Sequence, residues 1–199
     1  MMKLITFEGI EGVGKSTQIQ MLNDHIIQQG KTSSIIREPG STAFGEEVRN
    51  LLLNTDFNIS SEAELLLMFA SRAELVKTSL LNPQTDFILC DRFYDASIAY
   101  QGYGRGLSLD FIDSLINNIN CPIPDLTFLL DLDPLEGFNR KSEDKMDRIE
   151  SAGIDFFTRV RNGYLQQASK NTSRIKVIDA SNDISSISDQ ILSYFNNIR

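Results

Sequence analysis

A glycine-rich segment near the start of the chain has the residue types and the spacing that bind nucleotide phosphates. Gly9 and Gly14 flank four residues and are followed by Lys15 and Ser16, which matches the pattern G-x-x-x-x-G-K-[ST]. Glycines let backbone N–H groups point at phosphate oxygens, and the helical pattern that follows presents the positive end of a helix to them. The segment therefore predicts a site for the β- and γ-phosphates of a nucleotide, a feature shared by molecular switches, motors and kinases.

The same loop and one later carboxylate predict how the phosphates and a metal ion are held. Lys15 is expected to reach the β- and γ-phosphates, and the Ser16 hydroxyl is expected to bind Mg²⁺. Asp91 follows an apolar run and is placed to orient the metal ion or its water shell, with a helix cap as the alternative role. The residues expected to contact the phosphates of ATP are Gly9, Ile10, Glu11, Gly12, Val13, Gly14, Lys15, Ser16 and Thr17.

Five apolar runs bounded by turn signals predict buried strands. They span residues 4–7, 34–36, 87–90, 126–130 and 175–178. Between them apolar residues recur at helical spacing, in sets that begin at Ile19, Val48, Leu65, Phe156 and Ile184. Strands that alternate with helices predict an α/β fold in which a five-stranded parallel sheet is covered by helices on both faces. Such sheets bind ligands beyond the carboxyl ends of their strands. The segment GYGRG at 102–106 is expected to be a loop.

The composition fits one globular domain and narrows the choice of partners. The chain has 199 residues, so we expect a single domain over residues 1–199. A formal charge of -8 disfavours a nucleic acid as the main partner. Two cysteines cannot build a disulfide framework, and a single histidine disfavours a His-based zinc site or a Ser-His-Asp triad. No apolar run approaches the roughly 18 residues of a membrane span, so we expect a cytoplasmic protein with no membrane partner.

Five separate stretches of the chain match one family of kinases in the same order. They are FEGIEGVGKSTQ from Phe7, REPGST from Arg37, DRFYDASIAYQGYGRG from Asp91, PDLTFLLDLDP from Pro124 and DRIE from Asp147. On these motifs the chain resembles the thymidylate kinase family over nearly its whole length. The resemblance implies a three-layer P-loop NTPase fold with a mobile lid at about 137–150. It also implies transfer of the γ-phosphoryl group of ATP to dTMP, with Mg²⁺ as cofactor and a homodimer as the assembly.

The resemblance also assigns residues to the acceptor nucleotide. They are Glu11, Glu38, Pro39, Arg49, Phe69, Arg72, Arg92, Ser97, Tyr100 and Gln101. Arg92 and Arg49 would bind the acceptor phosphate, Arg72 would bond the thymine ring, and Tyr100 would crowd a 2′-hydroxyl and so favour deoxyribose. The alternatives are surface ion pairs for the two helical arginines, Arg49 and Arg72, and a core position for the aromatic rings.

Two positions depart from the family pattern. The family commonly has an aromatic residue one helical turn before the base-reading arginine, where this chain has Met68 and Phe69; we expect Phe69 to stack on thymine because a flat ring stacks better than a thioether. The lid carries Arg140, Lys141, Lys145 and Arg148 in place of a dense arginine series. Since residues 10–13 bring no basic side chain into the loop, the lid is expected to supply the additional cation.

The expected catalytic groups are all cations. They are Lys15, Arg92 and a lid arginine, with Arg140 preferred and Arg148 second. A phosphate acceptor with a second pKa near about 6 is already mostly ionised at neutral pH, so no strong general base is needed. The alternatives are a kinase for another nucleoside monophosphate or for a deoxynucleoside, and a nucleotide-binding regulator without turnover.

Overall fold

The computed structural model describes residues 2–141 and 147–198. Lys145, one of the expected lid cations, lies outside these residues. The five strands predicted from the apolar runs are confirmed, each slightly longer than its run. They are β1 (Lys3–Glu8), β2 (Ser33–Arg37), β3 (Phe87–Asp91), β4 (Leu126–Asp131) and β5 (Ile175–Asp179).

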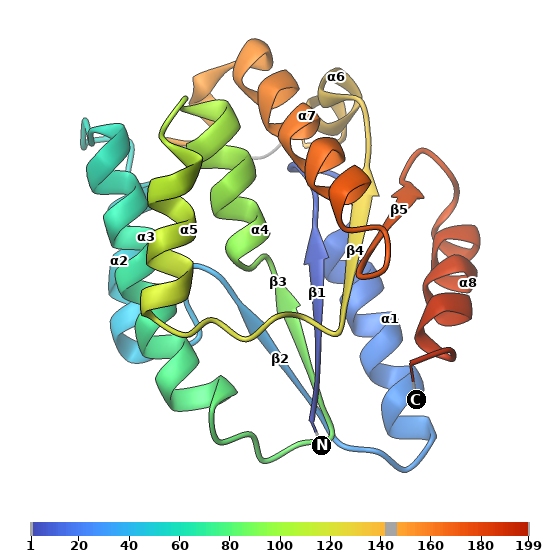
Figure 1. The fold of residues 1–199 in the computed structure, drawn as a ribbon. Coiled ribbons are helices and arrows are strands. Elements are labelled where there is room, and N and C mark those ends of the chain that lie inside the picture. The colour runs from blue at the N-terminus through green and yellow to red at the C-terminus, as the bar shows by residue number, and fades with distance from the viewer. Residues whose placement is uncertain (1, 142–146, 199) are drawn as a thin grey trace.

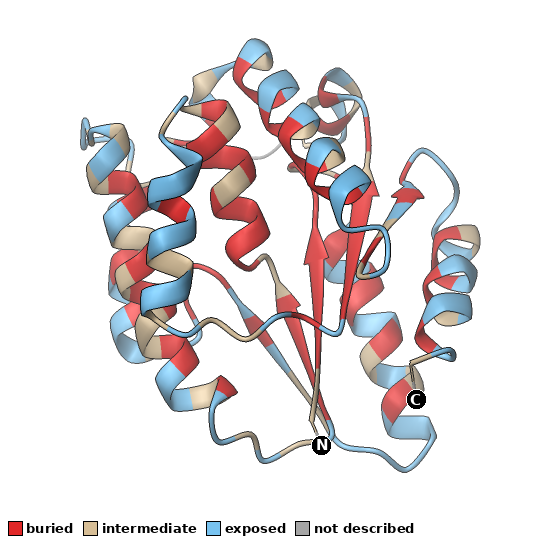
Figure 2. Ribbon diagram, in the orientation of Figure 1, coloured by how far each residue is buried: buried red, intermediate tan, exposed pale blue. Residues whose placement is uncertain are grey.

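All strand pairs in the sheet are parallel, in the order β2-β3-β1-β4-β5. The three central strands are buried almost throughout, as Figure 2 shows. Strands covered on both faces cannot alternate apolar and polar residues, which is why they form continuous apolar runs in the sequence. The core includes Ile5, Phe7 and Phe128, each 0% exposed.

The helices include every predicted set and several segments that were not predicted. The α-helices are α1 (Lys15–Gln28), α2 (Ala43–Leu53), α3 (Ser61–Leu75), α4 (Tyr94–Ser97), α5 (Leu109–Asn118), α6 (Pro134–Arg140), α7 (Ile154–Lys170) and α8 (Ile184–Phe195). Two π-helical segments, η1 (Val76–Leu80) and η2 (Ile98–Gly104), and a short 3-10 helix, η3 (Glu150–Ala152), complete the set.

Helices cover both faces of the sheet and make three layers (Figure 1). Helix α1 contacts β1, β2 and β3, and α8 contacts α1 and β5 on the same side. Helix α7 covers β4 and β5 on the opposite side, where it packs along η2. The predicted α/β fold with a five-stranded parallel sheet is therefore confirmed.

The expected loop at 102–106 is wrong for its first three residues, which continue the π-helical segment η2. Glycine is needed there for close packing, since a Cβ on Gly104 would lie 2.6 Å from the ring of Phe156 on α7. A Cβ on Gly102 would similarly lie 2.5 Å from the side chain of Leu109. Glycines that read as turn signals in the sequence thus serve helix packing here.

Within the described part of the chain, helix α1 begins without the side-chain cap that several other helices have, and its first turn lies next to the glycine-rich loop. Side chains cap several helices; Thr42 accepts from the N–H of Gly45, and Ser60 accepts from the N–H of Ala63. Helix α1 instead follows Gly14 in a left-handed conformation, and among the described residues no side chain caps it. Its first N–H groups are therefore available to an anion.

Candidate active site

A cavity of about 560 Å³ opens beyond the carboxyl ends of β1, β2 and β3. This is the edge of a parallel sheet at which ligands bind. Most of the residues predicted for the two nucleotides line it: Glu11, Gly12, Val13, Gly14, Lys15, Ser16, Thr17, Glu38, Pro39, Arg49, Arg72, Asp91, Arg92, Ser97, Tyr100, Gln101 and Arg140. Four predicted residues, Gly9, Ile10, Phe69 and Arg148, are not part of its wall.

The glycine-rich loop curls around the end of the Lys15 side chain. The ammonium group donates to the carbonyl oxygens of Gly9 at 3.3 Å and Ile10 at 3.0 Å. Gly9, Gly12 and Gly14 have φ values of 133°, 75° and 87°, which strain any residue with a side chain. Burial, and then the charge of Arg92, lower the pKa of Lys15 to about 8. A buried ammonium with this pKa is stabilised by an incoming anion.

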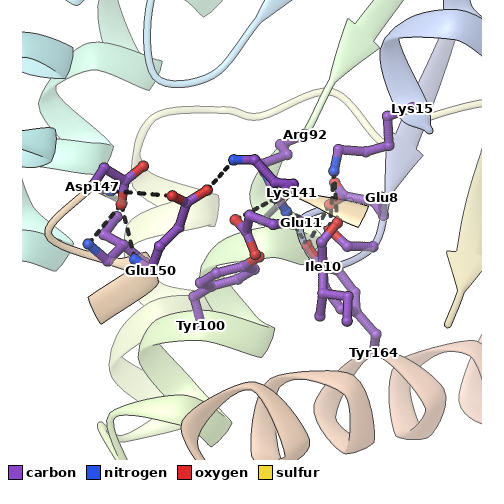
Figure 3. A network of polar contacts seen from close by, with 12 residues as sticks. Glu8, Ile10, Glu11, Lys15, Arg92, Tyr100, Lys141, Asp147, Glu150 and Tyr164 are labelled. Atoms are coloured by element: carbon purple, nitrogen blue, oxygen red, sulfur yellow. Dashed lines mark hydrogen bonds and ion pairs between the residues drawn. The ribbon is translucent and has the colours of Figure 1, made fainter. Parts of the chain in front are cut away.

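Arg92 occupies the centre of the site in a left-handed conformation with φ of 68°. Its guanidinium donates to the carbonyl oxygen of Gly9 at 2.6 Å and to the Glu11 carboxylate at 2.8 Å (Figure 3). The Tyr100 hydroxyl donates to the same carboxylate, lying 3.0 and 2.9 Å from its two oxygens. The predicted cation and the predicted acidic loop residue are therefore bonded to each other at the cavity wall.

Two residues behind Arg92 were not predicted. Glu8 is fully buried and accepts hydrogen bonds from the N–H of Phe93 and the hydroxyl of Tyr164, both at 2.7 Å. The Tyr164 hydroxyl also accepts from Arg92 at 3.3 Å. Burial, followed by the nearby Asp95, raises the pKa of Glu8 to about 8. A signal was present in the sequence, because a glutamate at the end of a buried strand needs a partner.

Arg72 forms a buried ion pair with Glu38. Nη2 of the arginine lies 2.6 Å from Oε2 of the glutamate, and the two side chains are 2% and 3% exposed. The guanidinium also donates to the Ser97 hydroxyl at 2.9 Å and to the Phe93 carbonyl oxygen at 3.2 Å. The surface ion pair considered for Arg72 is therefore wrong. Nε, Nη1 and Nη2 each donate one of the three hydrogen bonds found among the described residues, which leaves a second N–H on Nη1 for a ligand.

The expectation that the Phe69 ring faces the acceptor does not fit the structure. Phe69 is 4% exposed and packs with Leu65 and Ile112 in the core. Its ring lies behind Arg72, with the guanidinium carbon 4.6 Å from the ring centroid. Met68 lines the cavity instead. The residue four positions before Arg72, and not three, thus reaches the wall.

The two arginines expected to act from the lid differ in their positions. Arg140 lines the cavity, and its guanidinium bonds the Ala180 carbonyl oxygen at 3.0 Å and Glu136 at 2.7 Å. Arg148 lies away from the cavity wall and donates to the Leu52 carbonyl oxygen and to Glu64, both at 2.7 Å. Of the two arginines, Arg140 is therefore the better candidate for the additional cation. Arg148 is instead bonded to Glu64, outside the cavity wall.

Two further residues from the segment expected to be a lid line the cavity and were not predicted for the site. Lys141 lines the cavity and forms an ion pair with Glu150, as Figure 3 shows. Asp147 lines it too and accepts from the N–H groups of Ile149 at 2.8 Å and Glu150 at 2.9 Å. Lys141 could have been predicted, because it lies among the basic residues of the expected lid. The turn at Asp147 has no simple sequence pattern that would have predicted it.

Gly137, inside helix α6, lies directly against the phosphate-binding loop. A Cβ on Gly137 would lie 2.6 Å from the Glu11 carbonyl oxygen, and a Cβ on Gly12 would lie 2.2 Å from the Gly137 carbonyl oxygen. The backbones of loop and helix are therefore in direct contact. An isolated glycine in a helical segment is the sequence signal for such a contact.

We expect Gly137→Ala to displace the loop and to lower kcat/KM by at least about tenfold. The reason is that the new methyl group meets backbone, which cannot turn away as a side chain can, and such overpacking costs about 1–3 kcal/mol. Steady-state kinetics with a thermal melt would measure both effects. Leu135→Ala on the same helix is the control, because Leu135 is 61% exposed. Equal activity of Gly137→Ala and the wild-type chain would contradict this contact.

The predicted metal ligands fit a hard divalent cation. One carboxylate oxygen of Asp91, Oδ1, is buried and has no hydrogen-bond partner within residues 2–141 and 147–198. Ser16 lines the same cavity with an exposed side chain. A buried carboxylate oxygen without a donor is a suitable ligand for a cation or its water.

A parallel sheet with a glycine-rich loop between β1 and α1, into which the ammonium group of Lys15 points, defines a P-loop nucleotide-binding protein. Comparison with known proteins gives the family within this class. The family model for thymidylate kinase matches residues 7–191. The chain therefore belongs to the thymidylate kinase family, a family of kinases.

Individual relatives match over almost their full length. A thymidylate kinase of Chlorobaculum tepidum is 44% identical, with 96% of this chain and 95% of that protein covered. A thymidylate kinase of Ruthia magnifica is also 44% identical, with 95% of each chain covered. The crystal structure of thymidylate kinase from Ehrlichia chaffeensis superposes with a TM-score of 0.80 at 34% identity, covering 98% of both chains. No described helix is long and apolar enough to cross a membrane.

Proposed function

We propose that this chain transfers the γ-phosphoryl group of ATP to dTMP, giving dTDP and ADP. The observation that carries the proposal is that one cavity joins two sets of cationic groups. Lys15 belongs to the phosphate loop, and Arg92 and Arg49, which lie outside this loop in the sequence, line the same cavity. Two phosphorylated substrates can therefore meet end to end, which an NTP-hydrolysing switch would not require. The names of the relatives support dTMP as the acceptor.

The transfer needs two polyanions to be held in line. An oxygen of the acceptor phosphate attacks the γ-phosphorus, the bond from that phosphorus to the β–γ bridging oxygen breaks, and ADP leaves with the electron pair. Lys15 neutralises charge on the β- and γ-phosphates, and Arg92 holds the acceptor phosphate. Arg140 adds a cation from the lid. Catalysis rests on position and charge, in keeping with phosphoryl transfer in other kinases.

Mg²⁺ is the cofactor that we propose for this site. Ser16 and Asp91 would hold it, directly or through water, together with phosphate oxygens of ATP. When bound, the ion would supply positive charge that offsets the charge of the phosphates during the transfer. The buried, unpaired oxygen of Asp91 supports this assignment.

The acceptor side fits a deoxyribonucleotide with a pyrimidine base. Tyr100 is held against Glu11 at the cavity wall, and we assign its ring the place next to the acceptor sugar, where it would exclude a 2′-hydroxyl. Arg72 has one N–H on Nη1 for a base carbonyl oxygen, and Met68 offers an apolar contact to the ring. Residues 137–150 would serve as the lid of a single catalytic domain, excluding water from the transferred group.

Activity toward a panel of nucleoside monophosphates tests the proposal. A coupled assay of ADP release with dTMP, dUMP, dCMP, dGMP, dAMP and their ribose forms should show turnover with dTMP and less with dUMP. Turnover only with another monophosphate would replace dTMP as the substrate. Binding of ATP without turnover on any acceptor would support a regulator instead.

We further propose a homodimer in the cytoplasm. Phe44 and Leu51 on α2 are 51% and 44% exposed, seven residues apart and so on one helix face, and Leu66 on the adjacent α3 is 49% exposed. An apolar surface of this kind suits contact with a second copy. Both cysteines are free thiols, which fits a reducing compartment. Sedimentation velocity would measure the assembly, and a monomer at micromolar concentration would contradict the dimer.

A further inference from the structure

A buried carboxylate next to the acceptor side of the cavity collects four hydrogen bonds. Glu64 on α3 is 1% exposed. Its Oε1 accepts from Gln101 Nε2 at 3.0 Å and from Arg105 Nε at 3.2 Å. Its Oε2 accepts from Arg105 Nη2 at 3.0 Å and from Arg148 Nη2 at 2.7 Å. Glu64 is outside the cavity wall, but its partner Gln101 is part of that wall.

The two arginines keep Glu64 ionised. Burial alone would favour the neutral acid, but hydrogen bonds from Arg105, Gln101 and Arg148 together hold the pKa of Glu64 below its ordinary value. Arg148 is fixed in turn by the carbonyl oxygen of Leu52 at 2.7 Å. An ionised carboxylate accepts hydrogen bonds and donates none.

This charge dictates which way the Gln101 amide points. Only the NH₂ end of an amide can face a carboxylate, since its oxygen would be repelled. The carbonyl oxygen is therefore the end of Gln101 that is left to accept from a ligand in the cavity. Thymine and uracil carry a ring N–H at position 3, whereas cytosine carries an unprotonated ring nitrogen there.

We propose that Glu64 is a positioning residue that fixes the Gln101 amide with its oxygen toward the acceptor, and so selects bases with a ring N–H over cytosine. Arg105 and Arg148 serve this role by neutralising Glu64. The inference rests on the proposed function, because it concerns the acceptor nucleotide. Under this proposal Arg148 contributes to selection of the acceptor, and not to catalysis as expected from the sequence.

Glu64→Gln tests the proposal. The neutral amide can present either end to Gln101, so the Gln101 oxygen is no longer held toward the base. The ratio of kcat/KM for dTMP to that for dCMP should fall at least about tenfold, because the hydrogen bond that distinguishes the two bases is lost. Turnover at saturating dTMP should change less than this ratio. An unchanged ratio in a folded Glu64→Gln protein would overturn the proposal.

Arg148→Met is the matched variant. It distinguishes an effect on base selection from an effect of losing the contact between Glu64 and the proposed lid. It removes the same lid contact but keeps the Glu64 carboxylate beside Arg105 and Gln101. We expect a smaller loss of dTMP selectivity than in Glu64→Gln. An equal loss in both variants would assign the effect to the lid and overturn the role of the amide.

The wild-type chain gives a second measurement that needs no folded Glu64 variant. Hydrogen exchange of side-chain amides by NMR should show slow exchange for the NH₂ of Gln101 and fast exchange for that of Gln28, which is exposed. Equal, fast exchange of the two would overturn the fixed orientation. Absence of turnover with every pyrimidine monophosphate would instead contradict the proposed function, and the exchange result would still stand.

Discussion

Lys15→Ala is expected to lower turnover by on the order of 10² or more, as for the loss of other preorganised groups that stabilise developing charge. The side chain is held inside the loop by the carbonyl oxygens of Gly9 and Ile10, with Nζ 3.0 Å from the latter. Its ammonium is therefore already in place before ATP arrives. Alanine leaves the loop glycines unchanged, so the loss should fall on the charge and not on the fold.

Stopped-flow or steady-state ADP release at saturating ATP and dTMP would measure this effect. Lys170→Ala at the exposed end of α7 is the matched control, because it removes the same charge far from the cavity. A thermal melt should show that Lys15→Ala is folded. Turnover within a few-fold of the wild-type value would contradict the assignment of the phosphate loop.

The parts of the fold that could be predicted depend on local patterns. Strands β1, β3 and β4 are continuous apolar runs because both faces of the sheet are covered, and the phosphate loop is defined by glycine spacing. The π-helical segment η2 was missed because glycine is a turn signal in sequence, whereas Gly104 is required by the neighbouring Phe156. A glycine can signal a close contact, but the local pattern does not show which distant segment makes it.

In the candidate site, too, only the residues in local sequence patterns could be placed from the sequence. Arg92 and Lys15 could be placed because their motifs directly follow strands. The choice between Met68 and Phe69 depended on a rotation of helix α3 that packing decides, since Leu65 and Ile112 draw Phe69 into the core. Arg148 is drawn from the site by the buried charge of Glu64, which lies 84 residues away in the chain. Pairs of this kind are visible only once the fold brings them together.

Arg72→Ala should lower the free energy of unfolding and should also weaken binding of dTMP. A second variant can separate these two effects. The variant leaves the buried Glu38 carboxylate without its cation, and loss of one partner of a buried pair costs about 3–5 kcal/mol of unfolding free energy. Lys3→Ala is the control, because the Lys3–Asp125 pair is partly exposed and should contribute about 0–1 kcal/mol. Urea denaturation would measure both values.

The double variant Arg72→Met with Glu38→Met isolates recognition from stability. It removes both buried charges, so much of the lost stability should return, because apolar replacements of buried pairs are often neutral or stabilising. Affinity for dTMP should be weaker than in the wild-type chain. Methionine has neither the Nη1 N–H that would bind the base nor the hydrogen bond to the Ser97 hydroxyl. Calorimetry with dTMP and dUMP, beside turnover at saturating substrate, would test this. If the stable double variant bound dTMP as tightly as the wild-type chain, Arg72 would be a purely structural residue and the base would be read elsewhere.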